Sequence, residues 1–136
     1  MVDASFTHFG ILPSYNDVHR ADRQHWAVGF KKRQGVKERL SYCILAERVP
    51  VFIDPVCIEV TWYERDRRRD RDNIRSSVKF ILDALVEMGR LKSDSQKFVH
   101  DIKDVWPEPD KKNPRVVVKI TEMSTLMSRQ QTDQKR

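Results

Sequence analysis

Cysteine, glycine and long apolar runs are scarce in this sequence. Two cysteines and four glycines occur in 136 residues, so at most one disulfide bond is possible, and no CxxC or Cys/His cluster indicates zinc. The longest apolar runs, such as residues 42–46, have only a few members, whereas a membrane-spanning helix needs about 20. The first ten residues also lack the basic and apolar regions of a secretory signal. We therefore expect a cytoplasmic protein with free thiols and no membrane partner.

Charged residues, in contrast, are abundant. Lys and Arg number 26 against 20 Asp and Glu, which gives a net charge of +6, and charged residues make up 34% of the chain, compared with roughly 25% in an average protein. This balance favours a polyanionic partner, and nucleic acid is the first candidate because no basic amphipathic helix indicates a membrane surface. A merely basic soluble protein is the alternative. The apolar fraction of 39% supports a modest core, which leaves room for a partner subunit to complete it.

The spacing of apolar residues predicts six segments of regular structure. Alternation favours strands at residues 5–12, 49–63, 97–106 and 115–121, and a 3.6-residue period favours helices at residues 22–48 and 74–88. Residues 13–17 are typical of a turn. The order β-α-β-α-β-β predicts an α+β fold, in which two main helices cover a small mixed sheet in a single domain of residues 1–122. Residues 123–136 are polar and aperiodic, and we interpret them as a disordered tail.

Three carboxylates, Asp70, Asp72 and Asp94, form the first candidate site. Asp70 and Asp72 are two residues apart, so in an extended segment before a helix both side chains point the same way. Asp94 follows the helix and returns to the same end of the sheet if its strand folds back beside the first. Three converging carboxylates raise one another's pKa unless a cation lies between them, and Mg²⁺ takes such oxygen ligands. A magnesium ion held there suits phosphodiester hydrolysis, and Mn²⁺ is the alternative metal.

Lys79 is the fourth candidate residue of this site. It lies seven residues after Asp72, so at about 100° per residue the two directions on a helix differ by only about 20°. Both point away from the apolar stripe of the helix. A lysine in this place can reach a phosphate oxygen as that oxygen gains charge. Asp83 lies on the same flank and has a simpler interpretation as a partner of Lys79 or Arg90.

The acidic segment also has an ordinary structural interpretation. Residues 64–73, with the sequence ERDRRRDRDN, can be a solvated series of salt bridges in which Asp72 only caps the helix that Gly89 ends. The basic side chains nearby have the same two interpretations, because arginines are common in loops. The candidates for contacts with DNA phosphates are Arg67, Arg68, Arg69 and Arg71 in this run, and Lys31, Lys32 and Arg33 in the first helix.

Several blocks of the sequence resemble the RusA family of Holliday junction resolvases, whose members are typically found in phages and prophages. The family pattern is Asp-x-Asp-Asn before a helix, a Lys on that helix, Asp-Ala-Leu near its end and Asp-x-Gln after the next turn. Residues 12–17 are similar to the family's Leu-Pro-…-Asn opening. The other matching blocks are residues 70–73, Lys79, residues 83–85 and residues 94–96, and matched elements run from residue 10 to residue 122.

The resemblance implies a homodimer with a mixed sheet and helices, which binds four-way DNA junctions and makes two symmetric cuts. It also implies that Asp70, Asp72 and Asp94 are metal-binding catalytic acids and that Lys79 is an essential lysine. Two departures from the family stand out. Ser93 occupies a place where some members have a second acid, and the spacing from Asp72 to Lys79 is one helical turn longer than in the founding member.

The sequence therefore leads to two hypotheses. The first is a Mg²⁺-dependent, structure-selective endodeoxyribonuclease that resolves Holliday junctions and related branched DNA in recombination and repair. The second is an accessory protein that binds branched DNA without catalysis. The acidic trio favours the enzyme, because a pure binder gains nothing from carboxylates that face phosphates.

Overall fold

The strand over residues 56–63 illustrates how the sheet follows from the sequence. In the computed structural model, which describes residues 3–124 except for the side chains of residue 19 and residues 21–24, β2 (Val56–Tyr63) alternates buried with half-buried residues. Val56, Ile58, Val60 and Trp62 lie in the core. Branched and aromatic side chains of this kind favour a pleated, half-buried surface. The predicted strand with two unlike faces is thus confirmed over residues 56–63, whereas residues 49–55, which were predicted as its first part, are not strand.

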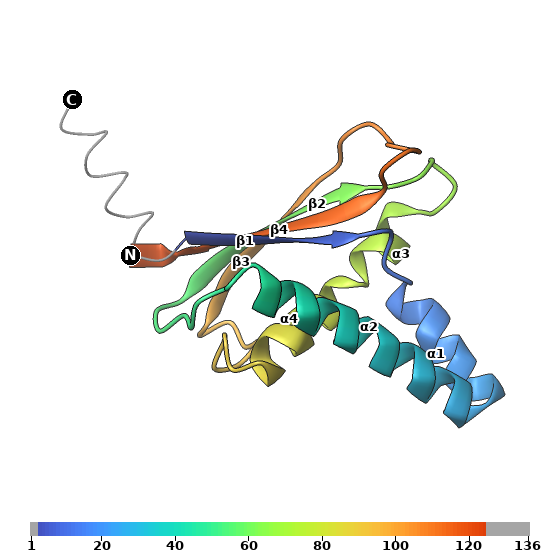
Figure 1. Cartoon of the computed structure of the whole chain (residues 1–136), viewed down its shortest axis with the longest axis horizontal. Coiled ribbons are helices and arrows are strands. Elements are labelled where there is room, and N and C mark those ends of the chain that lie inside the picture. The colour runs from blue at the N-terminus through green and yellow to red at the C-terminus, as the bar shows by residue number, and fades with distance from the viewer. Residues whose placement is uncertain (1–2, 125–136) are drawn as a thin grey trace.

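The described residues form one four-stranded mixed sheet around β2 (Figure 1). The other strands are β1 (Asp3–Phe9), β3 (Val99–Val105) and β4 (Arg115–Glu122). In the order β1-β4-β2-β3, β4 is antiparallel to both of its neighbours, whereas β2 and β3 are parallel. A parallel pair needs a long crossover connection. The chain between β2 and β3 provides it, and this crossover carries the acidic motif.

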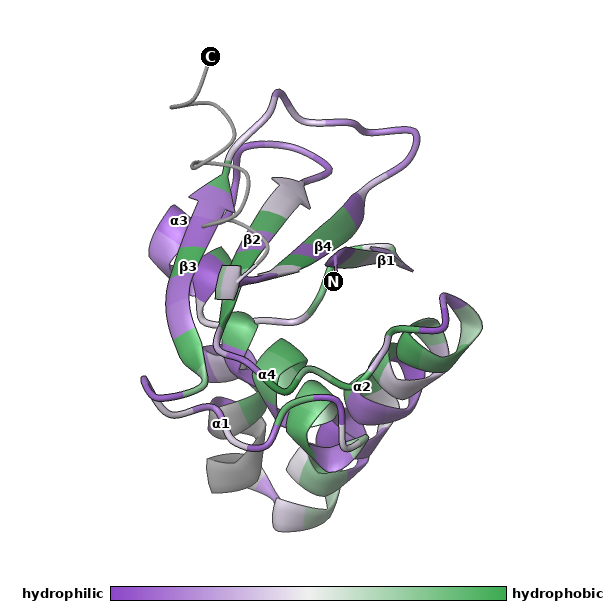
Figure 2. Cartoon of the chain, turned by 90° about the vertical axis from the view of Figure 1, so that its left-hand side faces the viewer, coloured by the Kyte–Doolittle hydropathy of each residue, from purple (hydrophilic) through white to green (hydrophobic). Residues whose placement is uncertain are grey.

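The helices of the described chain lie on one side of this sheet (Figure 1). They are α1 (Tyr15–Gln24), α2 (Trp26–Ala46), α3 (Arg71–Arg75) and α4 (Val78–Glu87). α2 packs against β1 and α4, and it buries Val36, Leu40 and Ile44 at the predicted helical spacing. Figure 2 shows hydrophobic residues gathered where α2 and α4 adjoin the sheet, while the long loops beyond the strands are hydrophilic.

This architecture confirms the predicted α+β fold of a single domain with a small mixed sheet. The order β-α-β-α-β-β holds when α1 with α2, and α3 with α4, each count as one helical segment. No helix within residues 3–124 has the length and apolar character needed to cross a membrane. The predicted tail lies outside the described residues except for Met123 and Ser124, which form hydrogen bonds with Pro55 and Asp54.

The segment predicted as a turn at residues 13–17 opens helix α1 instead. Ser14 is buried, its Oγ accepts a hydrogen bond from the N–H of Asp17 at 3.0 Å, and its carbonyl accepts one from Val18 at 3.2 Å. This is the geometry of a helix N-cap, and a serine with an acid three residues later is a start signal. The turn prediction is wrong here because Pro and Ser favour helix starts as well as turns.

The single helix predicted for residues 74–88 is divided by Ser76 and Ser77, which separate α3 from α4. Ser77 Oγ donates to the carbonyl of Pro13 at 2.9 Å, and Ser76 Oγ donates to the carbonyl of Asn73. Serine hydroxyls that bond to the backbone compete with the regular helix ladder. The apolar period runs on across the break, so periodicity alone does not reveal it.

α4 ends in a glycine turn that reverses the chain. Gly89 has φ +72°, in the left-handed region that favours glycine. Its N–H donates to the carbonyl of Val86 at 3.0 Å, and the N–H of Arg90 donates to the carbonyl of Leu85 at 2.8 Å. These paired bonds define a Schellman motif and confirm the helix end predicted at Gly89. The reversal brings the following loop back along the helix.

Candidate functional site

The first two candidate acids lie at the N-terminal end of α3. Asp70 is the N-cap residue, with φ −70° and ψ 147° but no side-chain cap hydrogen bond, and Asp72 lies in the first turn. The interpretation of Asp72 as the cap is therefore wrong. The apolar stripe that begins at Ile74 marks where the helix meets the core, after its backbone has already begun. Negative charge is favourable at this end of a helix.

Both of these carboxylates are exposed and unpaired. Among the side chains that the structure describes, Asp70 and Asp72 have no hydrogen-bond or ion-pair partner. The interpretation as a series of salt bridges is correct for Asp66. Its carboxylate forms an ion pair with the Arg68 side chain at 3.7 Å and accepts a hydrogen bond from the backbone N–H of Arg68 at 3.0 Å. The two acids of the motif are thus exceptions within a segment rich in arginine.

Lys79 lies between two further carboxylates. Its Nζ is 3.0 Å from Asp83 Oδ1 and 3.0 Å from Asp94 Oδ2, so the expected pairing with Asp83 is confirmed. The hydrogen bonds with Asp94 and then Asp83 raise the pKa of Lys79, and Lys79 in turn lowers the pKa of Asp94. The three side chains are 42% to 53% exposed, so all remain accessible to a partner.

The three candidate acids carry the type of ligand that Mg²⁺ binds, but the structure does not bring them together into a metal site. Asp70 and Asp72 offer the carboxylate oxygens that hard cations bind. Yet no three His, Cys, Asp or Glu side chains of the described chain lie close enough together to hold a metal ion. Asp94 is paired with Lys79 through Oδ2, which leaves Oδ1 for another ligand. The predicted metal role of the three acids stays a prediction.

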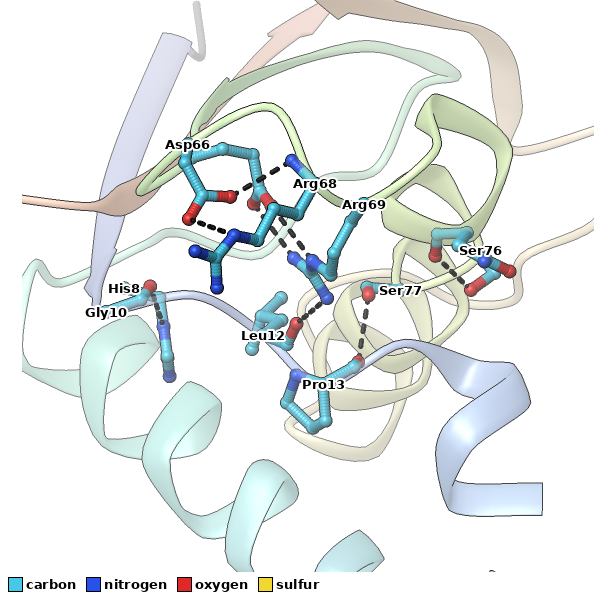
Figure 3. A network of polar contacts seen from close by, with 11 residues as sticks. His8, Gly10, Leu12, Pro13, Asp66, Arg68, Arg69, Ser76 and Ser77 are labelled. Carbon is cyan, nitrogen blue, oxygen red and sulfur yellow. Dashed lines mark hydrogen bonds and ion pairs between the residues drawn. The ribbon is translucent and has the colours of Figure 1, made fainter. Parts of the chain in front are cut away.

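The start of α1 and the loop before it are held against the segment around α3, although the two regions are distant in sequence. Asn16 Nδ2 donates to Asn73 Oδ1 at 2.8 Å, which joins the opening of the motif to its Asp-x-Asp-Asn block. Ser77 reaches the carbonyl of Pro13 close by, as Figure 3 shows. Side-chain hydrogen bonds therefore position the start of α3 relative to the rest of the fold.

Arg69 has the contacts of a structural residue. Its Nε and Nη2 donate to the two carboxylate oxygens of Glu64 at 2.9 and 2.8 Å. Its Nη1 donates to the carbonyl of Leu12 at 2.9 Å (Figure 3). Glu64 is only 9% exposed, so this bidentate pair neutralises a buried charge. All three guanidinium nitrogens of Arg69 are occupied within the chain, and they clamp the loop between β2 and α3.

The other candidate arginines of this loop present their charge at the surface. The Arg68 side chain is 90% exposed, and that of Arg67 is 74% exposed although it forms an ion pair with Glu108. The Arg71 guanidinium carbon lies 5.2 Å from the centre of a Trp106 ring. Unlike Arg69, these three arginines keep donors available for a polyanion.

The basic cluster on α2 is divided between two grooves. Lys31 and Lys32 line a cavity of about 410 Å³ together with Pro13. Arg33 lines another cavity of about 270 Å³, near Phe80. Lys31 and Lys32 therefore adjoin the loop before α1, while Arg33 adjoins α4.

The sequence analysis did not predict the two stacked tryptophans beside Asp70. The rings of Trp62 and Trp106 have centroids 6.1 Å apart and an interplanar angle of 20°. Alternation placed Trp62 in the core, but nothing local indicates its partner. The one available signal was the Trp-Pro-x-Pro sequence from Trp106 onward, which is typical of a stiff loop with an aromatic residue at its start.

Comparisons with known proteins find no relative of this chain. No protein-family model matches the chain, and a search of curated proteins finds no match either.

Proposed function

We propose that this protein is a Mg²⁺-dependent, structure-selective endodeoxyribonuclease that cuts four-way and related branched DNA, as the RusA-like motif implies. One observation carries the proposal. Asp70 and Asp72 keep exposed, unpaired carboxylates within an arginine-rich loop. Contacts that join separate blocks of the motif, from Asn16 to Asn73 and from Lys79 to Asp94, support it further.

Unpaired carboxylates are unfavourable on a surface that binds DNA. The net charge of +6 attracts a polyanion, but Asp70 and Asp72 alone repel its phosphates. Carboxylate oxygens bind hard divalent cations, so a cation between the acids and the DNA reverses the sign of this interaction. Asp94 is the third ligand in the proposal. Such an ion, when bound, polarises the phosphoryl oxygen and lowers the pKa of a water molecule.

Lys79 has a role of its own beside the acids. Its raised pKa keeps the ammonium protonated across the neutral range, and its ion pair keeps Asp94 ionised. Because its side chain is 48% exposed, Lys79 can donate to a phosphate oxygen as negative charge develops there. Asp83 holds the ammonium in position when Asp94 turns to another partner.

In the proposal, exposed cationic side chains contact the DNA backbone. Arg67, Arg68 and Arg71 flank the acids in the sequence. Lys31 and Lys32 on α2 are two further cations, beside the loop before α1. Phosphate contacts provide affinity but no sequence information, so the choice of a junction depends on its shape. A homodimer completes the proposal, because two strands must be cut and a two-fold pair presents two equivalent sites.

Cleavage of a labelled four-way junction tests this function. The wild-type protein should make paired cuts across the branch with Mg²⁺, none with EDTA, and none in a matched linear duplex. Asp72→Asn should abolish cleavage and keep junction binding, because the amide retains the shape of the side chain and loses its charge. Asp101→Asn removes an exposed carboxylate from β3 and is the matched control that should cut normally. Cutting by Asp72→Asn at the wild-type rate would show that the catalytic assignment is wrong.

A second candidate is a binder of branched DNA without catalysis. The observation that favours it is that the described residues hold no preassembled cluster of three metal-ligating side chains. This protein would bind the junction equally well in EDTA and cut it in neither Mg²⁺ nor Mn²⁺. Ser93, in the place where some relatives of the motif have an acid, would then be the first position to restore.

A further inference from the structure

A cavity of about 250 Å³ adjoins the acidic site, and Asp70 forms part of its wall. This volume is slightly below the ~300–1,000 Å³ of sites for drug-sized ligands, so it suits one planar ring system. Its walls combine apolar and charged groups in about equal parts. The apolar ones are Trp62, Ile74, Trp106, Pro107 and Pro109. The charged ones are Glu64, Asp66, Arg67, Arg69, Asp70 and Arg71.

Trp106 supplies the accessible aromatic surface of this cavity. Trp62 beneath it is 1% exposed, whereas Trp106 is only half-buried. One face of Trp106 stacks on Trp62, and the Arg71 guanidinium carbon lies 5.2 Å from the centre of a Trp106 ring. A cation over an aromatic ring is a weak contact at an exposed site, so a better stacking partner can displace Arg71.

The floor of the cavity is fixed to the sheet. The Trp62 indole N–H donates to Asp104 Oδ1 at 2.9 Å, and Arg75 of α3 donates to the other oxygen of the same carboxylate. Asp104 thus orients the lower tryptophan and ties α3 to β3. Because these groups are held before any ligand arrives, little ordering is needed on binding.

The two rims of the cavity are joined to each other. Arg67 forms an ion pair with Glu108, and the N–H of Asp110 donates to the carbonyl of Glu64 at 2.8 Å. These contacts connect the loop after β2 with the loop after β3. The two prolines restrict the second loop further, because each fixes one backbone dihedral. The cavity is therefore a built feature of two loops.

We propose that this cavity binds a single unstacked nucleobase of the branched DNA, with the base lying on Trp106 and Arg71 moving to the adjacent phosphate. The inference rests on the proposed function and deepens it. The flat rings in its wall match the planar ring of a nucleotide, and Arg67 and Arg71 in the lining match its anionic phosphate. The carboxylates of Glu64 and Asp66 in the same lining are paired with arginines. Stacking on an aromatic side chain tolerates every base, because each base has a π-face.

This pocket would provide a physical basis for structure selectivity. Extruding a base from an intact duplex requires unpairing and unstacking, whereas a base at a branch or mismatch is extruded more easily. A pocket beside Asp70 that must receive a base therefore favours branched DNA over linear duplex. It also positions the neighbouring phosphate next to the candidate acids.

Fluorescence in EDTA tests the pocket without any cleavage. The test uses a four-way junction with 2-aminopurine at the branch and the Trp26→Phe protein, in which only Trp62 and Trp106 emit. Binding should quench the tryptophan emission and change the 2-aminopurine emission, and a linear duplex with the same label should do neither. Saturable junction binding without change in either signal would overturn the inference.

Variants of Trp106 identify the ring responsible. Trp106→Ala should weaken junction binding about tenfold, within the range measured for the loss of one base stack, whereas Trp106→Phe should restore most of the affinity. Phe9→Ala removes an aromatic side chain that is 70% exposed on β1 and should leave binding unchanged. Equal affinity of the wild type, Trp106→Ala and Trp106→Phe would overturn the inference. If Trp106→Ala fails to fold by circular dichroism, the 2-aminopurine signal of the Trp26→Phe protein decides.

Failure of the pocket and failure of the nuclease give different results. Metal-dependent paired cuts with no Trp106 dependence contradict only the pocket. Base unstacking that depends on Trp106, in a protein that never cuts, contradicts only the nuclease and supports the pocket. Absence of any junction binding contradicts both.

Discussion

Lys79 links α4 to the loop after it through charge. The lowered pKa of Asp94 means that its share of the ion pair stabilises the fold above the pKa of the unfolded chain and is lost as pH falls through the folded pKa. The raised pKa of Lys79 means that its share is present at neutral pH and is lost as pH rises through the folded pKa. Since both side chains are nearly half exposed, the pair contributes only about 0–1 kcal/mol.

The titration of Asp94 provides a direct test of this pairing. In the Lys79→Met variant, the pKa of Asp94 should rise toward the ordinary value, because its main hydrogen bond and its nearest positive charge are both removed. Carboxyl-carbon NMR shifts followed from neutral to acid pH measure the midpoint. Lys92→Met removes a lysine that lies over Phe98 and should leave the midpoint in place. An unchanged Asp94 midpoint in Lys79→Met would contradict the pairing.

At the residue scale, the contacts of individual side chains were also the feature least predictable from the sequence. Arg67, Arg68 and Arg69 are consecutive and identical in type, yet only Arg69 is tied to Glu64 and Leu12. That difference arises from the burial of a carboxylate and from a loop that is close in space but distant in sequence. The acids of the motif were identifiable by their spacing, but their lack of partners was not.

At the scale of elements, the end of α4 decides where Asp94 lies. The chain reverses at Gly89, whose φ of +72° is unfavourable for any residue with a Cβ. Gly35 is the matching case in regular helix, since it lies within α2. A Cβ added at Gly35 would meet only the Arg39 side chain, at 3.4 Å, which is ordinary contact with a flexible group.

The two glycines should therefore respond to alanine in opposite directions. Gly89→Ala should lower the free energy of unfolding by about 1–2 kcal/mol because of left-handed backbone strain. Gly35→Ala should raise it by up to about 1 kcal/mol, because alanine favours the helix. Urea denaturation of both variants measures the difference. Equal effects of the same sign would contradict the assigned helix end.

The elements predicted well are those whose signal is both local and periodic. β2 and the apolar stripe of α4 follow from period and residue type, because one face of each is buried. α1 was missed because Pro13 and Ser14 are compatible with two local structures. The break at Ser76 and Ser77 depends on a hydrogen bond to Pro13, a contact that only the folded chain creates.

At the scale of the whole molecule, apolar side chains remain on the surface of the single chain. Ile53 is 82% exposed, Trp26 and Tyr42 are each 72% exposed, and Leu45 is 55% exposed. Tyr42 and Leu45 are three residues apart on α2 and therefore share one face of the helix, and an exposed apolar face is typical of contact sites. The lean apolar composition of 39% points the same way, and both observations support the proposed homodimer.

Dimers of one wild-type and one variant subunit test whether each subunit cuts one DNA strand. In a dimer whose subunits each cut one strand, wild-type chain co-expressed with excess Asp72→Asn forms mixed pairs with one functional site. A plasmid that carries a cruciform should then be nicked, whereas the wild-type dimer should linearise it. Excess Asp101→Asn, which keeps both sites functional, should preserve linear product. Sedimentation velocity should give twice the chain mass of 16.1 kDa. A particle of single-chain mass that still makes paired cuts would contradict the dimer and leave the role of Asp72 intact.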